Sequence, residues 1–300
     1  MSEAKEEVEA PKPSQTPARR EWSAAGLRIE PLTAAIGAEV QGVVLSGNLS
    51  AAILDEIYAA LNKYLVLFFR DQDLSPKDQL EFAATFGTPA QPHPVYPHVP
   101  GFEQVVLLEN DGDRPPDTDD WHTDLTFQPK TPFLSVLHAR EVPETGGDTL
   151  WANMYLAFDA LPAELQALTS RLSAVHDMGA FRNAYLGDTN DVEALNAALA
   201  SVGSAVHPVA PKHPVTGKQL LFVNRSFTQH VVGMQKAESD RLLEYLFSHI
   251  ETPNNQVRFR WSKGAVAMWD NRCTQHFAVA DYLPAYRCMH RVIIDTDRRA

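Results

Sequence analysis

The stretch DWHTDLTF, residues 120–127, places a histidine and a carboxylate two positions apart, between two aromatic residues. It looks like a strand, and on a strand His122 and Asp124 would point to the same side. The pair alone is weak evidence, because a chance histidine at an exposed strand end is the commoner explanation of such spacing. What matters is whether another part of the chain supplies a third ligand.

That third residue is found in AMWDNRCTQHFAVADYLPAYRCMHRVII, residues 267–294, where His276 follows a predicted strand that ends at Trp269 and Asp270. Two histidines and one carboxylate, with three open positions, form the facial triad of mononuclear non-haem Fe(II) oxygenases. A zinc site would more often contain cysteine or three histidines. The residue types therefore favour iron.

Two arginines follow His276 on a further predicted strand. Arg287 and Arg291 would share one face of this strand, while Cys288 and His290 take the other. Two guanidinium groups in one cavity repel each other unless each meets an anion, and arginine binds oxyanions through a planar fork of donors. The pattern predicts two acidic ligands; the alternative is a pair of surface arginines on an edge strand.

The rest of the pattern predicts a mainly β protein with helical insertions. Residues 27–45 indicate two short strands around a glycine turn, and residues 64–69 (YLVLFF) a buried strand. Further short strands are predicted at 103–109, 133–142, 148–153, 218–224, 256–261, 264–270 and 287–295. Many strands with a few outer helices are typical of a double-sheet jelly roll.

Four helices are expected from apolar periodicity, at residues 49–64, 75–87, 161–172 and 235–250. Ser75 before Pro76, with Asp78 in the first turn, is a good helix start, and Gly87 would end that helix. Residues 179–206 are polar and irregular, which predicts a mobile loop or lid.

These motifs, taken together, resemble those of a known family. The motifs WHTDLTF, GGDTLW, WDNRCTQH and ADYLPAYRCMHR are similar to those of Fe(II)/2-oxoglutarate-dependent taurine dioxygenases, in the same order and over nearly the whole chain from Leu27. The resemblance implies a double-stranded β-helix, the jelly-roll form that the strands had suggested. It also implies Fe(II) as cofactor, with 2-oxoglutarate and O2 as co-substrates.

The resemblance assigns roles by position. His122, Asp124 and His276 would be the iron ligands and the catalytic centre. Thr149 and Arg287 would bind the distal carboxylate of 2-oxoglutarate, and Arg291 the sulfonate of the substrate. The other substrate-binding positions would be His93, Tyr96, Phe127 and Phe227. Simpler interpretations exist, with Thr149 as a plain strand residue, the two phenylalanines as core aromatics, and His93 and Tyr96 as braces of a proline-rich loop.

The reaction that the resemblance implies is oxygenation of a small sulfonate, taurine first, which yields sulfite, an aldehyde, succinate and CO2. Other alkyl sulfonates, sulfate esters and phenoxyacetate-type carboxylates are alternatives, as is a non-catalytic jelly-roll protein that binds an anion. Taurine enzymes have an asparagine where this chain has Thr118, and a family phenylalanine aligns with Arg182, or with Phe181 after a shift of one residue. Both differences concern the amine end of the substrate.

Composition sets the wider limits. The formal charge of -12 argues against a nucleic-acid or anionic-membrane partner, and no apolar run is long enough to span a bilayer. Residues 1–26 are predicted to be a disordered tail before a dioxygenase domain at 27–300. Two cysteines, Cys273 and Cys288, suggest a reducing cytoplasm, although a bridge between them stays open. The family's habit implies a homodimer or homotetramer that takes a small anionic substrate.

Overall fold

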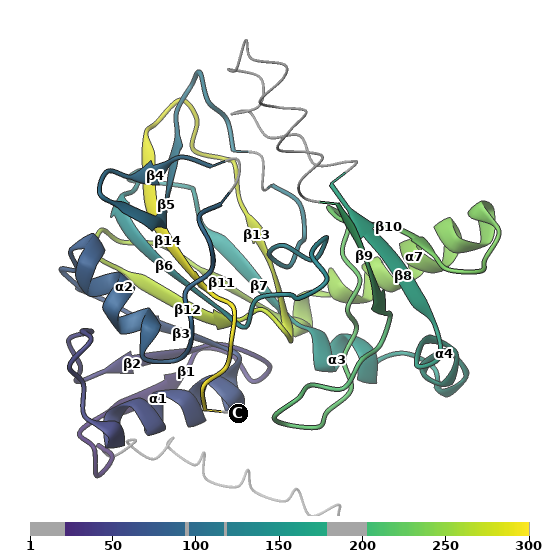
Figure 1. Ribbon diagram of the computed structural model, residues 1–300, viewed down its shortest axis with the longest axis horizontal. Coiled ribbons are helices and arrows are strands. Elements are labelled where there is room, and N and C mark those ends of the chain that lie inside the picture. Colours follow the sequence, from purple (N-terminus) through teal and green to yellow (C-terminus); the bar gives the residue numbers. More distant parts are fainter. Residues whose placement is uncertain (1–21, 94–95, 117–118, 179–202, 300) are drawn as a thin grey trace, which may run out of the picture.

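The computed structural model describes residues 22–93, 96–116, 119–178 and 203–299, and in this part the strands form three sheets (Figure 1). The largest sheet has the order β1-β2-β3-β12-β6-β14-β5-β4, and only β2 and β3 pair in parallel. The bounds of its strands, in that order, are Arg28–Pro31, Ala38–Gln41, Val66–Phe69, Val266–Asp270, Leu134–Glu141, Arg287–Ile294, Phe102–Asn110 and His98–Val99.

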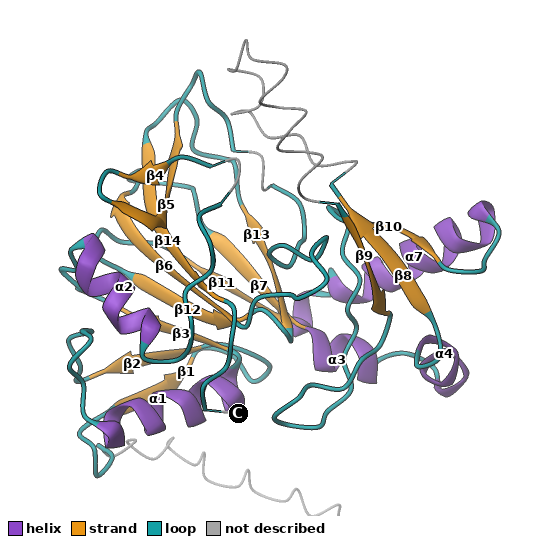
Figure 2. Cartoon of the chain, in the orientation of Figure 1, coloured by secondary structure: helices purple, strands orange, loops and turns teal. Residues whose placement is uncertain are grey.

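Two three-stranded sheets complete the β structure (Figure 2). One has the order β11-β7-β13, with strands Gln256–Phe259, Thr149–Asn153 and Thr274–Ala278. The other, which we call the small sheet, has the order β10-β8-β9, with strands Thr228–Val231, Ser173–Asp177 and Ser204–Pro208.

The large sheet packs against β11-β7-β13 through an aromatic core. The rings of Phe68 and Phe259 stack with centroids 4.1 Å apart, and Trp151 lies edge-on to both Phe68 and Trp269, at 5.2 and 5.6 Å. Aromatic pairs in such geometry add to the burial of apolar area. Two sheets enclosing one core confirm the predicted jelly roll.

The buried strand predicted at residues 64–69 is β3, and its continuous apolar sequence has a clear cause. Val66 and Phe68 face the core between the sheets, whereas Leu67 and Phe69 face a second core beneath two helices. These helices are α1 (Ala51–Tyr64) and α2 (Pro76–Ala84), which cover the outer face of the large sheet (Figure 1). A strand covered on both faces needs apolar residues at every position.

Helix α2 begins as predicted and ends earlier. Ser75 accepts the backbone N–H of Asp78, and the Asp78 carboxylate accepts the N–H of Ser75, which makes a reciprocal cap. The helix ends at Ala84, so Gly87 is not its stop signal. Gly87 meets a different need, because a Cβ there would lie 1.7 Å from the carbonyl oxygen of Thr296. The close passage of the C-terminal segment excludes any larger side chain.

Three more helices lie on the side of the small sheet: α3 (Met154–Asp159), α4 (Ala163–Thr169) and α7 (Lys236–Ile250), followed by a short 3-10 turn, η1 (Pro253–Asn255). The helices predicted at 161–172 and 235–250 correspond to α4 and α7, whereas α3 was not predicted. The strand predicted at 218–224 is wrong. That segment is extended, but its backbone N–H groups reach Val209, Pro211 and Met154 separately, so it forms no ladder with any other described strand.

The predicted loop at 179–206 is partly wrong, since Ser204–Val206 belong to β9. Residues 179–202 lie outside the described residues, as do residues 1–21 of the predicted tail. Residues 22–26 form a turn in which Ser23 bonds to Leu27 and Glu56, so where the domain begins stays a prediction. Cys273 and Cys288 are free thiols. None of the described helices combines the length and apolar character that a membrane crossing requires.

Candidate active site

The two predicted histidine ligands are held together by their own backbones. His276 lies on β13, and its N–H and carbonyl exchange hydrogen bonds of 2.8 and 3.1 Å with the carbonyl and N–H of His122. Their imidazole centroids are 4.1 Å apart. The Nδ1 atom of His122 bonds to the carbonyl of Asp120 at 2.8 Å, which leaves its Nε2 atom to face the cavity.

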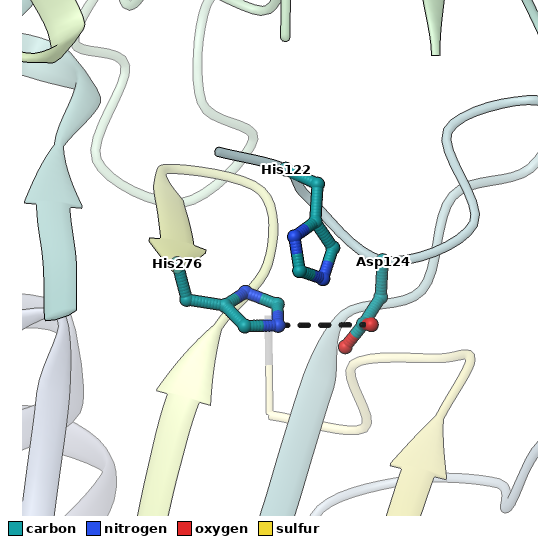
Figure 3. Close-up of side chains that lie close together, drawn as sticks. All are labelled: His122, Asp124 and His276. Atoms are coloured by element: carbon teal, nitrogen blue, oxygen red, sulfur yellow. Dashed lines mark ion pairs between the residues drawn. The ribbon is translucent and has the colours of Figure 1, made fainter. Parts of the chain in front are cut away.

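Asp124 reaches the same point from a turn (Figure 3). The expectation that His122 and Asp124 share a strand is wrong, because His122 forms only an isolated bridge and the chain turns at Asp124. Leu125 takes a left-handed conformation, with φ of 55°, and this reverses the chain direction directly after the carboxylate. One ligand atom from each of His122, Asp124 and His276 lies within 4.8 Å of the others, and all three residues are buried.

The electrostatics of this cluster favour a divalent cation. Burial lowers the pKa of His122 and of His276, so both imidazoles are neutral and have a lone pair to donate. Burial opposes ionisation of Asp124, but the guanidinium of Arg291, helped by the hydrogen bond from Ser135, holds the pKa of this carboxyl well below its usual range. Two neutral nitrogens and one anionic oxygen are the donor set of a non-haem Fe(II) site.

Asp124 is fixed through both of its carboxylate oxygens. Oδ1 accepts from Nη1 of Arg291 at 2.8 Å and lies 3.9 Å from Nε2 of His276. Oδ2 accepts from the hydroxyl of Ser135 at 2.8 Å.

Ser135 is itself the end of a chain of donors that the sequence did not reveal. The indole N–H of Trp269 donates to Oδ1 of Asn271 at 2.9 Å, and Nδ2 of Asn271 donates to the Ser135 hydroxyl at 2.8 Å. Trp269 and Asn271 belong to the motif WDNRCTQH, but the motif alone does not predict that they hydrogen-bond toward Ser135. Ser135 lies in a strand without any recognisable motif, so its contact with Asp124 could not be predicted from the sequence.

A cavity of about 590 Å³, including its open mouth, adjoins the metal-ligand cluster. Arg287 and Arg291 both face it from β14, which confirms that they share one face of that strand. Its other lining residues are Tyr96, Leu108, Asn110, Pro116, His122, Leu137, Thr149, Trp269, His276 and Ala278.

Arg287 and Thr149 make one end of this cavity suited to a carboxylate. Arg287 is 6% exposed, and among the described residues no acidic side chain lies within ion-pair distance and nothing accepts from its Nε. Burial lowers its pKa. A buried guanidinium without a counter-ion is costly, and a dicarboxylate such as 2-oxoglutarate would relieve that cost.

The residues predicted to bind substrate fall into two groups. Arg291 and Tyr96 line the cavity, with the guanidinium 5.6 Å from the Tyr96 ring centroid. His93 instead accepts the backbone N–H of Tyr96 at 3.1 Å and lines a neighbouring pocket. This contact matches the loop-bracing alternative for His93.

Phe127 and Phe227 pack edge to face at 5.1 Å, and the Phe227 ring lies 6.4 Å from that of His122. Both are buried in a small apolar cluster with Leu125, Met178 and Ile293, beside the cavity lining and not part of it. Their substrate role stays a prediction. Thr118, Phe181 and Arg182 lie outside the described residues.

A second group of possible ligands, His213, Asp270 and Cys273, has a structural explanation. Nδ1 of His213 accepts the N–H groups of Val215 and Thr216, so its Nε2 carries the proton and donates to Asp270 at 3.1 Å. Arg272 also pairs with Asp270, at 2.7 Å. Burial raises the pKa of the Cys273 thiol. With its carboxylate and imidazole already bonded, this group is a buried ion-pair network.

Comparison with known proteins identifies a matching family profile, curated relatives and a solved structure of similar fold. The sequence profile of the family described as "Taurine catabolism dioxygenase TauD, TfdA family" matches residues 28–293. Among curated proteins, the chain is 38% identical to an alpha-ketoglutarate-dependent sulfate ester dioxygenase of Pseudomonas putida, over 89% of both chains. It is 36% identical to an alkylsulfatase of Acinetobacter baylyi, over 89% of this chain and 84% of that protein.

A solved structure shows the same fold. The crystal structure of a taurine dioxygenase from Burkholderia xenovorans superimposes with a TM-score of 0.78 at 36% identity, over 90% of each chain.

Proposed function

Because the chain belongs to the TauD/TfdA family of alpha-ketoglutarate-dependent dioxygenases, we propose that it oxygenates an organic sulfate ester whose far end carries no charge. Enzymes of this family use Fe(II), 2-oxoglutarate and O2. A sulfonate is the second candidate, because the structural neighbour described above is a taurine dioxygenase.

The observation that supports this choice is the lining of the cavity. Arg287 and Arg291 provide two cationic ends, whereas Leu108, Leu137 and Pro116 provide apolar surface. No acidic side chain stands among the described residues that line it, and Asn110 offers only a neutral amide. An ammonium group such as that of taurine would lose its hydration there without gaining a counter-ion, and an unpaired buried charge costs several kcal/mol. An alkyl chain has no such cost.

Two of the relatives support a sulfate ester as the first candidate. The two curated relatives described above act, by name, on sulfate esters, and they match the chain at 38% and 36% identity. Sulfate monoesters and sulfonates present the same three-oxygen anion, so Arg291 suits either.

In this proposal His122, Asp124 and His276 hold Fe(II), and Thr149 with Arg287 holds the distal carboxylate of 2-oxoglutarate. When bound, Fe(II) supplies the O2 activation that converts 2-oxoglutarate to succinate and CO2 and hydroxylates the substrate. The protein contributes position: a 1 Å misplacement of the target carbon costs on the order of a hundredfold in rate.

Arg291 links the substrate anion to the metal ligands. Its Nη1 atom is used by Asp124, while its Nε is buried and has no partner among the described residues. The Nε–Nη2 edge therefore remains for a bidentate contact with an oxyanion. An anion bound to that edge is separated from the Asp124 carboxylate only by the guanidinium of Arg291. The carbon next to the anion is therefore held close to the metal.

The anion that is released reveals the substrate class. Hydroxylation of the carbon that bears a sulfate ester gives a hemiacetal sulfate, R–CH(OH)–OSO3⁻, which collapses to an aldehyde and sulfate. Hydroxylation of the carbon next to a sulfonate gives an aldehyde and sulfite. Hydroxylation of a phenoxyacetate releases a phenol.

The test is a panel of hexyl sulfate, hexanesulfonate, taurine and phenoxyacetate, each with 2-oxoglutarate and Fe(II), scored for sulfate, sulfite, phenol and succinate. We expect hexyl sulfate to give sulfate and succinate in equal amounts, with kcat/KM at least about tenfold above that for taurine. Arg291→Gln should lower kcat/KM for hexyl sulfate by about a hundredfold or more, since it removes a charge-assisted bond pair. Preference for taurine, or phenol as the main product, would contradict the proposal.

A further inference from the structure

Thr149 receives a hydrogen bond that its predicted role does not account for. The indole N–H of Trp261 donates to the Thr149 hydroxyl oxygen at 3.0 Å, and both side chains are buried. Thr149 opens β7, and Trp261 follows β11, the strand paired with β7 at the register Phe259–Thr149. The contact thus joins two neighbouring strands directly beside the cavity.

A tryptophan indole can only donate, whereas a threonine hydroxyl can both donate and accept. With its oxygen accepting from Trp261, the hydroxyl has its own proton left to donate. Among the described residues no acceptor lies within hydrogen-bond distance of that proton, and Thr149 lines the cavity together with Arg287. The hydroxyl and the guanidinium are therefore both donors toward the same space.

We infer that Trp261 is a positioning residue for the co-substrate: its N–H fixes the Thr149 hydroxyl as a donor to the distal carboxylate of 2-oxoglutarate. The inference rests on the role proposed above for Thr149 and Arg287. Without Trp261, the hydroxyl would be free to rotate and would have to be ordered again each time the carboxylate binds. The contribution of Trp261 is that the donor is already oriented.

Packing holds the indole in place. Its ring lies edge-on to Phe259 at 5.1 Å and at 6.3 Å from Trp151, and Trp261 is 7% exposed. Trp151 offers a matched control in the same core. Trp151 is also buried, but its N–H has no partner among the described residues. Replacement of either tryptophan by phenylalanine removes similar volume, and only one replacement removes a hydrogen bond.

The experiment measures binding without turnover. Mn(II)-loaded enzyme is titrated with N-oxalylglycine, an isostere of 2-oxoglutarate, by calorimetry. We expect Trp261→Phe to weaken binding by about three- to tenfold, the effect of one net hydrogen bond, and Trp151→Phe to change it by less than about twofold. Thr149→Val should weaken binding by about tenfold or more.

The double variant Trp261→Phe/Thr149→Val decides whether Trp261 acts through Thr149. If it does, adding Trp261→Phe to Thr149→Val weakens binding of N-oxalylglycine by less than about a further twofold. Equal effects of Trp261→Phe in both backgrounds, or no effect in the wild type, would overturn the inference. If Trp261→Phe does not fold, the benzothiophene isostere of the Trp261 side chain keeps the shape and removes the N–H, with the same expected result.

Failure of the proposed function would look different. Wild-type enzyme that does not bind N-oxalylglycine would refute the co-substrate site itself. Wild-type enzyme that binds it but releases no sulfate from hexyl sulfate would refute only the proposed substrate.

Discussion

Ser135 and Arg291 approach the Asp124 carboxylate through different oxygens, and neither residue belongs to the metal-ligand set. Arg291 bonds to Oδ1, and Ser135 bonds to Oδ2. Because Ser135 accepts from Asn271, its own proton has to point at Asp124. The geometry leaves the carboxylate little freedom to rotate away from His122 and His276, so the metal would bind to a site that is already formed.

Ser135→Ala should therefore weaken metal binding by about tenfold, within the range typical of residues that hydrogen-bond a ligand. Mn(II) affinity of the metal-free protein would be measured by calorimetry. Ser239→Ala is the control, since Ser239 is equally buried but its hydroxyl serves the backbone N–H of Val231, near the N-terminal turn of α7. Equal loss of metal affinity in both variants would mean that Ser135 acts only through stability.

At the residue scale, the motifs were enough to predict that His122, Asp124 and His276 lie together, but not which backbone geometry brings them together. His122, Asp124 and His276 do come together, yet the carboxylate reaches the site through a turn at Leu125 and not through strand alternation. The bond from Arg291 to Asp124 was not predictable, since it joins residues that only the folded sheet brings together.

The turn after Asp124 is supported by the small sheet. The Thr126 hydroxyl is completely buried and bonds to Nδ1 of His176 on β8 at 3.0 Å and to Nδ2 of Asn224 at 3.1 Å. The backbone carbonyl of Thr126 bonds to Nε2 of His207 on β9 at 2.8 Å. Oδ1 of Asn224 in turn accepts the N–H of Phe227. One network thus connects the turn that carries Asp124, two strands of the small sheet and the backbone of Phe227.

Thr126→Val should break this connection while it preserves shape. Two buried polar partners would lose their bond, which costs about 1–3 kcal/mol of unfolding free energy. We also expect 2-oxoglutarate consumption to become uncoupled, with more succinate than aldehyde formed. Both are measurable, by urea denaturation and by product ratio. Thr169→Val is the control: Thr169 is a buried threonine on α4 whose hydroxyl donates to carbonyls of its own helix, so this variant should lose stability but keep a product ratio of one.

At the element scale, most strands of the large sheet and of β11-β7-β13 were predictable, because burial leaves an apolar pattern such as that of β3. The strands β4 and β13, the second of which carries His276, were not predicted. The small sheet was not predictable. Its strands are only four or five residues long: SAVHD and SAVHP alternate buried residues with more exposed ones, and TQHV does not alternate. Conversely, residues 218–224 have the composition of a strand but pair with no strand in the described part of the chain.

The whole molecule keeps several histidines buried and neutral, which makes its stability depend on pH. Burial is the main cause, and the nearby charge of Arg140 the next, of a pKa of about 4 for His138. Burial, and to a smaller extent the neighbouring imidazole of His207, lowers the pKa of His176 to about 3. In the unfolded chain both would titrate near pH 6.5, so between about pH 6.5 and 4 the unfolded state binds more protons. Stability is therefore lost as the pH falls through this window.

We expect the metal-free protein to lose about 1 kcal/mol of unfolding free energy per buried neutral histidine between pH 7.5 and 5.5. Urea midpoints at the two pH values measure this loss. His138→Gln, which removes one titrating group, should show a smaller difference between the two pH values. An unfolding free energy that does not change over this interval would contradict the assignment of these histidines as neutral.

At the scale of the molecule, the jelly roll and the family were predictable from motifs that span nearly the whole chain. Assembly was not, because no partner contact is encoded in a motif. That the protein is a cytoplasmic homodimer or homotetramer, without nucleic-acid or membrane partners, stays a prediction.

The division of the fold into sheets has an evolutionary consequence. Thr149, Arg287 and Arg291 belong to β7 and β14, whereas Met178 and Phe227, in the apolar cluster beside His122, stand at the ends of β8 and β10. Substitutions in the small sheet would alter this apolar cluster without changing the strands that carry Thr149, Arg287 and Arg291. We therefore expect the small sheet to tolerate sequence changes that β7 and β14 would not.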